Sequence, residues 1–246
     1  VQNLVDLPMK SPDYLSALLA NNILGGSASA RLFMNLREDK AFTYGSYSSL
    51  GSSKYTPARF RAYASVRNAV TDSAAVELLS EIDRMAQEPV SQDELAMAKA
   101  EYVGNFVMAL ENPATVANYA FRIASEGLPK DFYKTYLSRI NSVTPEEVQA
   151  AARKYFTADN AQVVVAGKGR DVLPALEKMT FKGQPLTVNY YTPLAEKAEQ
   201  PNYDAAIPEG LSADQVIADY IEAVGGRALL ESVSSLRLLA EGTVQG

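Results

Sequence analysis

Alternation of apolar and polar residues predicts the β-strands of this chain. Residues 1–8 alternate from the first position, and residues 42–50 and 59–66 alternate on either side of a Ser- and Pro-containing turn. Two such runs joined by a short turn predict an antiparallel hairpin over 42–66. The continuous apolar run at 161–167 predicts a buried strand.

Helical spacing of apolar residues, with start and stop residues around it, predicts the other elements. Ser11, Pro12 and Asp13 are typical of a helix start, and Gly25-Gly26 of its end, which gives a helix over 11–24. A second helix through Leu36 is expected to have Ser27 or Ser29 as its N-cap. A capping box at 91–94 begins a long helix that ends near 110. Further helices are predicted over 71–85, 114–126, 130–141, 145–156, 172–178 and 212–224.

This order of elements predicts an α+β fold. Strands and helices do not alternate regularly, so we expect one antiparallel-rich sheet with helices packed on one face, and no Rossmann arrangement. We assign 1–180 to the main domain, 181–210 with its recurring prolines to a linker, and 211–246 to the start of a second domain that is truncated. Both ends are expected to be cut, because the chain begins in strand-like sequence and 243–246 is strand-like too.

The absence of histidine and cysteine from the sequence excludes several kinds of chemistry. Without histidine the chain lacks the commonest zinc ligand and the commonest general base, and without cysteine it has no disulfide and no thiol nucleophile. Acidic residues form no tight cluster that would make a carboxylate cage for a metal. We therefore expect no metal site and no catalytic residue in this chain.

Charge and hydropathy argue against several classes of binding partner for this chain. The net charge of -6 argues against non-specific nucleic-acid binding, which requires an excess of Lys and Arg. No apolar run approaches the roughly 18–20 residues of a membrane span. Gly25-Gly26 before a helix is better explained as a tight turn between helices than as a phosphate loop, since the Gly spacing and the Lys of such a loop are missing.

Arg37 and Tyr44 are the candidate binding residues. One is predicted to end a helix and the other to start a strand, so both side chains can converge on a peptide carbonyl. Taken alone, the pattern favours a solvated Arg at a helix C-terminus and a Tyr at a half-buried strand start. Arg59, Arg61 and Tyr63 share one face of the predicted hairpin, where solvated cross-strand neighbours are the favoured interpretation and the lining of a chamber is the alternative.

Three segments together resemble the non-catalytic repeat of the M16 (pitrilysin, or inverted-zincin) metallopeptidase family. The first is LGGSASARLFMNLREDKAFTYGSYSS at 24–49. The second is SQDEL with a following Ala-Lys at 91–99, and the third combines SVTPEEV at 142–148 with AQVVVAG at 161–167. Their order and spacing make the resemblance specific over about residues 1–180.

The resemblance implies a division of labour between two homologous domains that close around a peptide. One domain carries H-x-x-E-H, in which two His bind zinc and the Glu activates water. The other contributes an Arg/Tyr pair, which Arg37 and Tyr44 match, so these residues are expected to bind substrate. The predicted helix 11–24 stands where the zinc helix would be and contains no His, so zinc is expected only in a catalytic partner, in cis or in trans.

Two other interpretations stay open. The chain could be a proteolytically inactive structural or assembly subunit of the same fold, or, with little support, an independent hydrolase that uses Ser or carboxylates. Residues 213–246 faintly resemble the opening of β-rich envelope domains of the lipoprotein-sorting type, although an amphipathic helix and a strand of unknown fold fit equally. That resemblance leads us to expect the bacterial periplasm or cell envelope as the location.

Overall fold

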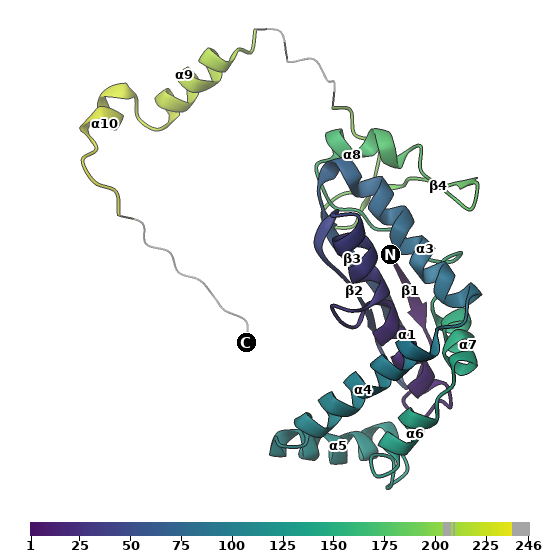
Figure 1. The fold of residues 1–246 in the computed structure, drawn as a ribbon. Helices are drawn as coiled ribbons and strands as arrows, with labels where there is room; N and C mark the ends of the chain where they lie inside the picture. Colours follow the sequence, from purple (N-terminus) through teal and green to yellow (C-terminus); the bar gives the residue numbers. More distant parts are fainter. Residues whose placement is uncertain (204–207, 209, 238–246) are drawn as a thin grey trace. The chain divides into compact units, whose positions relative to one another are not determined.

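A three-stranded antiparallel sheet organises the first part of the molecule (Figure 1). The computed structural model describes residues 1–203, 208 and 210–237, and its contacts divide the chain into two units, Val1–Glu199 and Gln200–Gly246. The strand order is β1-β3-β2, so β2 lies at an edge of this sheet. The strands are β1 (Gln2–Val5), β2 (Thr43–Leu50) and β3 (Ala58–Val66).

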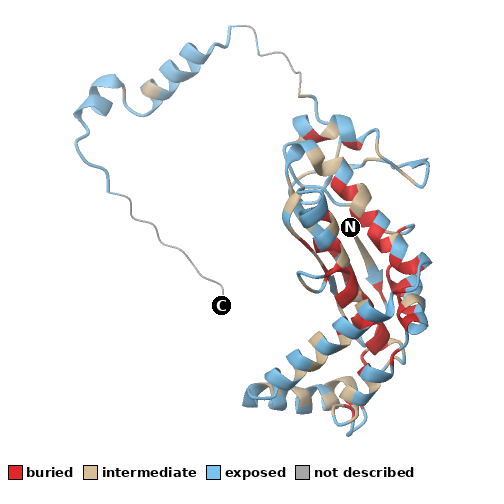
Figure 2. Ribbon diagram, in the orientation of Figure 1, coloured by how far each residue is buried: buried red, intermediate tan, exposed pale blue. Residues whose placement is uncertain are grey.

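Helices cover one face of this sheet. Phe60 and Ala62 of β3 and Ser46 and Ser48 of β2 turn toward the helices and are buried, whereas the alternate residues of β3 are exposed (Figure 2). Phe60 stacks on Phe156 with 4.3 Å between the ring centroids. The predicted α+β fold is confirmed. The covering helices are α1 (Tyr14–Gly25), α3 (Thr71–Gln87) and α7 (Pro145–Tyr155), with η2 (Asn68–Val70) before α3.

Capping residues define the starts of several helices, and the capping box at 91–94 is the one that the sequence predicts. Ser91 and Glu94 form a reciprocal capping box at α4, and Thr144 and Glu147 form another at α7. The Asn112 side chain accepts from the N–H of Ala114 at 2.9 Å at the start of α5. The helices in this part are α4 (Gln92–Ala109), α5 (Pro113–Glu126) and α6 (Tyr136–Ser142).

Other predicted helix starts are wrong by a few residues. α1 begins at Tyr14 because Ser11 to Asp13 form a turn, in which the N–H of Asp13 donates to Ser11 Oγ at 3.3 Å. Ser27 and Ser29 hydrogen-bond to each other at 3.0 Å, and neither caps the next helix. The N-cap of α2 (Arg31–Phe33) is instead Ala30, which makes no side-chain bond. The start of α3 at Thr71 agrees with the prediction, and its N-cap is Val70. Residues 131–134 form turns, so α6 begins at 136.

The predicted buried strand at 161–167 is also wrong. Only Gln162 bridges to Gln2, with N–H···O bonds of 2.9 and 2.8 Å, and Val164 is 68% exposed. Among the described residues, this bridge is the only backbone pairing that the run makes.

Short elements follow the main helices. Residues 180–198, most of which the sequence assigns to a linker, form two small hairpins, and Phe181 and Leu186 pack against the core. In the second unit Ser212 caps a helix by accepting from the N–H of Gln215 at 3.1 Å. The predicted domain boundaries at 180 and 211 stay predictions, and 243–246 lies outside the described residues. These elements are α8 (Gly169–Leu176), β4 (Thr180–Phe181), β5 (Gln184–Pro185), β6 (Tyr190–Tyr191), β7 (Lys197–Ala198), α9 (Ala213–Ala223) and α10 (Arg227–Ser232).

Candidate functional site

Arg37 lies on a π-helical turn. The predicted second helix becomes α2 followed by η1 (Met34–Asp39), a π-helical segment. The turn closes with N–H groups of Ala41 and Phe42 donating to the carbonyls of Arg37 and Leu36 at 3.1 and 2.9 Å. Ala41 then takes a positive φ of 51°, which reverses the chain into β2. Single π-helical turns are rare and are frequent at functional sites.

The π-helical turn is fixed to α3 by side-chain hydrogen bonds. Asn35 Nδ2 donates to Glu77 Oε2 at 3.0 Å and to Glu81 Oε1 at 2.8 Å. Lys40 Nζ donates to Asn35 Oδ1 at 2.8 Å, and Arg84 neutralises the buried Glu81 at 3.1 Å. The backbone that carries Arg37 is therefore held from both sides of that residue.

A bidentate ion pair fixes the preceding helix to α4. Arg31 Nε and Nη2 donate to Glu94 Oε1 and Oε2 at 2.7 and 3.0 Å. These bonds, with those from Ser91, lower the pKa of Glu94 to about 2 against the opposing effect of its partial burial. Glu94 thus ties together the capping box of α4 and the segment that leads to Arg37.

The Arg37 side chain is positioned and still half exposed. Its guanidinium carbon lies 4.7 Å from the centroid of the Phe33 ring, one helical turn earlier. Its Nε lies 3.5 Å from Glu38 Oε1, and 47% of the side chain is accessible to solvent. Since a guanidinium carries five N–H donors, most of them remain able to bind an external acceptor.

Tyr44 projects from a bulge at the start of β2. Its side chain is 97% exposed, and no described residue hydrogen-bonds its hydroxyl. The register to β3 shifts between Thr43 and Ser46, which marks a β-bulge. Thr43 Oγ1 accepts from the N–H of Gly45 at 3.2 Å and lies 2.7 Å from the carbonyl oxygen of Ser65. The threonine hydroxyl therefore holds the bulge that turns Tyr44 outward.

Arg37 and Tyr44 lie on consecutive elements that contact each other, η1 and β2. No hydrogen bond joins their side chains among the contacts of the described residues. They therefore form two separate donors beside the edge strand β2. Sequence reasoning missed Phe33 and Thr43: the four-residue spacing from Phe33 to Arg37 would have indicated the first, whereas Thr43 acts through a bulge that has no sequence signal here.

The helix at the position expected for zinc ligands holds none. Asp13, the acid at the N-cap of α1, is ion-paired to Lys154 Nζ at 2.6 Å and accepts from the Tyr155 hydroxyl at 3.0 Å. The hydrogen bond from Lys154, followed by that from Tyr155, lowers the pKa of Asp13 although burial opposes it. Over the described residues there is no group of three His, Cys, Asp or Glu that could hold a metal ion.

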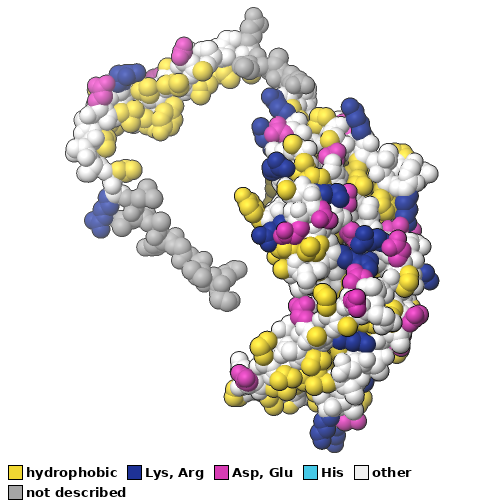
Figure 3. Space-filling model, viewed as in Figure 1, with side chains coloured by type: hydrophobic (Ala, Val, Ile, Leu, Met, Phe, Trp, Pro, Cys, Tyr) yellow, Lys and Arg dark blue, Asp and Glu magenta, His cyan; other side chains and the backbone are white. Residues whose placement is uncertain are grey.

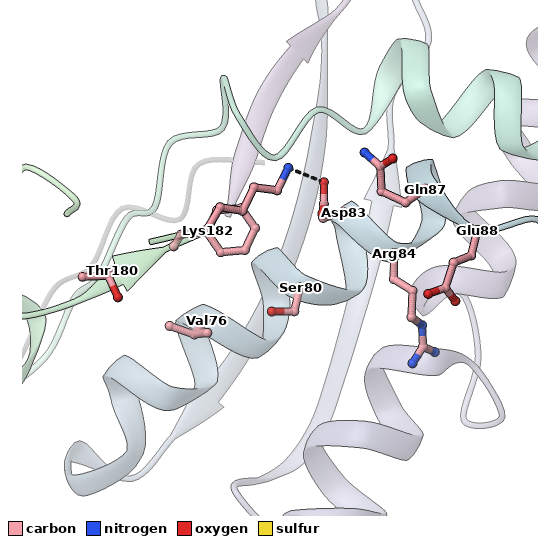
Figure 4. Close-up of a pocket in the computed structure, with 9 residues that line it drawn as sticks. Val76, Ser80, Asp83, Arg84, Gln87, Glu88, Thr180 and Lys182 are labelled. Atoms are coloured by element: carbon pink, nitrogen blue, oxygen red, sulfur yellow. Dashed lines mark hydrogen bonds and ion pairs between the residues drawn. The ribbon is translucent and has the colours of Figure 1, made fainter. Parts of the chain in front are cut away.

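A depression of about 420 Å³ lies between α3 and the β4–β5 turn, and neither Arg37 nor Tyr44 lines it (Figure 4). Lys182 Nζ lies 2.6 Å from Asp83 Oδ1 and 3.1 Å from Asp159 Oδ1. The close-up shows Lys182 and Asp83 directed at each other, not into free space. Because these charges are neutralised within the chain, the depression is explained by packing of the β4–β5 turn on α3.

Apolar side chains gather on the surface of α4 and α5 (Figure 3). Phe121 is 69% exposed and Met108 is 62% exposed. The other exposed apolar residues of these helices are Met97, Val107, Leu110 and Val116. Contiguous apolar surface of this kind is typical of a contact with another protein surface.

No described helix is both long enough and apolar enough to cross a membrane.

Comparison with known proteins finds similarity to zinc proteases and to the inactive domain of the M16 peptidases. Residues 4–102 match the sequence model of the peptidase M16 inactive domain. A protein named "uncharacterized zinc protease" in Streptomyces coelicolor is 32% identical over 136 residues, which cover 54% of this chain and 29% of the relative. Another in Bacillus subtilis is 26% identical over 155 residues, which cover 62% of this chain and 37% of the relative. The chain thus spans about a third of the length of these curated relatives.

A solved structure has the same fold. The peptidase M16 inactive domain from Pseudomonas fluorescens superposes with a TM-score of 0.59 at 24% identity, over 63% of this chain and 37% of that one.

Proposed function

Since residues 4–102 match the M16 inactive domain, as the sequence resemblance predicted, we propose that this chain is the substrate-binding half of a zinc peptidase. It completes a peptide-binding chamber for an H-x-x-E-H domain that lies in the same polypeptide or on a partner chain. The observation that carries this proposal is the placement of two exposed hydrogen-bond donors, on Arg37 and Tyr44, on braced segments beside the open edge of β2.

The proposed chemistry of this half is binding and charge stabilisation. The zinc of the catalytic domain supplies the activated water. The Tyr44 hydroxyl and the Arg37 guanidinium donate hydrogen bonds to the carbonyl oxygen of the peptide as negative charge develops on it. The free edge of β2 offers backbone groups with which an extended peptide can pair. Both donors stand on fixed backbone, so little reorganisation is needed when the charge forms.

The test is a peptidase assay of the combined halves. This chain is mixed with its H-x-x-E-H partner, or the intact precursor is used, with zinc and a fluorogenic peptide. Arg37→Ala and Tyr44→Phe are each expected to lower kcat about 10²–10³-fold, the usual cost of removing one oxyanion donor. Tyr55→Phe, which removes a hydroxyl from another exposed tyrosine, is the matched control and should keep full activity.

Three results would count against the proposal. Full activity in both Arg37→Ala and Tyr44→Phe removes their role. Chelator-sensitive peptidase activity of this chain without a partner would mean that this chain binds the catalytic metal itself, which contradicts the proposal. Silence of the combined halves favours a scaffold of the same fold. We also propose the bacterial periplasm or envelope as the compartment. The resemblance of residues 213–246 supports this location, and cell fractionation tests it.

A further inference from the structure

The face of the sheet opposite the helices carries arginines without acidic partners. Arg59 and Arg61 alternate along β3, and both are exposed. No carboxylate among the described residues forms an ion pair with either of them. Other cations of the same unit are paired, such as Arg31 with Glu94 and Lys154 with Asp13. The two arginines therefore keep their full capacity for an external anion.

The strand neighbours of these arginines carry no negative charge. Arg59 lies opposite Leu4 of β1, and Arg61 lies opposite Gln2 of β1 and Ser49 of β2. Tyr63 and Tyr47 oppose each other at the next position of this face. The charges at these positions of the face are therefore all positive, and the uncharged neighbours are aromatic, polar or aliphatic.

A continuous row of contacts joins this face to Arg37. The guanidinium of Arg61 lies 4.4 Å from the ring centroid of Tyr63. From Tyr63 the ring centroids follow at 6.3 Å to Tyr47 and 5.8 Å to Phe33, on which Arg37 lies. We call Arg37, Phe33, Tyr47, Tyr63 and Arg61 the cation–aromatic row. Stacking on the rings holds the guanidinium groups along the surface, which reduces the entropy lost when they bind an anion.

We propose that this face selects extended peptide segments that carry carboxylates at alternate positions. Side chains two residues apart on a strand repeat at about 6.5–7 Å, and Arg59 and Arg61 have this spacing. An extended peptide presents its alternate side chains with the same repeat. Each guanidinium can bind one carboxylate through two parallel N–H···O bonds. The inference rests on the proposed function, because it names the substrate class that the half-enzyme presents to its catalytic partner.

Binding is measured without any catalytic partner. Fluorescence polarisation follows a labelled peptide of alternating Glu and Thr on the 246-residue chain at low salt, with alternating Gln and Thr as the neutral peptide. The double variant Arg59→Gln/Arg61→Gln is expected to bind the Glu peptide about tenfold more weakly. Lys130→Gln/Lys134→Gln makes the same charge change on exposed lysines between α5 and α6, and should bind as the parent does. Raising the salt concentration should weaken binding of the Glu peptide more than binding of the Gln peptide.

Three outcomes overturn the inference: equal binding of the Glu and Gln peptides, no effect of the arginine double variant, or an equal effect of the lysine pair. Tighter binding of a single-stranded oligonucleotide through the same arginines would assign the face to nucleic acid instead. In the combined peptidase, the arginine variant should raise KM for the Glu peptide alone and leave kcat unchanged. A further outcome is that Arg37→Ala and Tyr44→Phe leave the peptidase activity unchanged while peptide binding still depends on Arg59 and Arg61. In that case the proposed function fails and this inference survives.

Discussion

Replacing Gly25 by alanine is expected to disturb the contact between α1 and β2. A Cβ at this position would lie 2.4 Å from the backbone N of Ser48, 2.7 Å from Ser48 Oγ and 2.9 Å from Leu32 Cδ1. The serine and leucine side chains can rotate, but the backbone N of an edge strand cannot. The helix or the strand must therefore shift to accept the methyl group.

The magnitude follows from two opposing effects. Forcing a methylene-sized group into a packed site costs about 1–3 kcal/mol. Alanine in place of glycine in a helix recovers about 0.5–1 kcal/mol. Since the closest contact of Gly25 is with backbone, we expect a net loss of about 1–2 kcal/mol in the free energy of unfolding. Gly104→Ala in α4 is the matched control, because no atom lies within 4 Å of its added Cβ, and it should gain about 0.5–1 kcal/mol.

Urea unfolding followed by far-UV circular dichroism measures both variants, since the chain has no tryptophan to report on unfolding. Opposite signs for Gly25→Ala and Gly104→Ala are the expected result. A Gly25→Ala protein as stable as the parent would show that the close approach of α1 to β2 is not required. Because β2 carries Tyr44, Gly25→Ala should also lower kcat/KM of the combined peptidase, which Gly104→Ala should leave unchanged.

Two further changes test the segments that hold the site. Glu94→Gln should lower the free energy of unfolding at pH 7 by about 1–2 kcal/mol, a value reduced for the partial exposure of the pair. The pKa of Glu94 in the folded protein lies near 2, below its ordinary 4.5. This stabilisation is therefore complete above pH 4.5 and is lost as the pH falls toward 2, where the urea midpoints of variant and parent should converge. A difference in midpoint that stays constant with pH would contradict the ion pair. Thr43→Val should cost about 1 kcal/mol and lower kcat/KM by misplacing Tyr44, and unchanged kinetics would exclude a positioning role for Thr43.

The helix caps were predictable because their signals are local. Ser91 with Glu94, and Thr144 with Glu147, form their bonds within four residues, so their spacing alone indicates the structure. The two faces of β3 were equally predictable, since a strand alternates with a period of two. Arg37 and Tyr44 were found through a family resemblance, and their role stays a prediction.

Features that depend on register or on distant partners could not be predicted. Tyr47 and Tyr63 lie opposite each other, and this pairing can be predicted only if the β2–β3 register is known. The bulge near Tyr44 shifts that register by one residue. The run at 161–167 has the composition of a buried strand, yet a strand forms only where a neighbouring backbone can pair with it. Apolar composition indicates a preference for burial, and the available partner decides whether a ladder forms.

The irregularities beside the two proposed binding residues, Arg37 and Tyr44, have a common physical consequence. A π-helical turn adds one residue to a helix, and a β-bulge adds one residue to a strand. Each insertion rotates the side chain that it carries away from the direction a regular element would give, and each sacrifices regular hydrogen bonds. Here Asn35 and Thr43 compensate with side-chain bonds of 2.7–3.2 Å. Exposed residues with no role would gain nothing from this arrangement, whereas donors that must meet a peptide carbonyl need a fixed direction. The strain and its compensation therefore support binding roles for Arg37 and Tyr44 independently of the family resemblance.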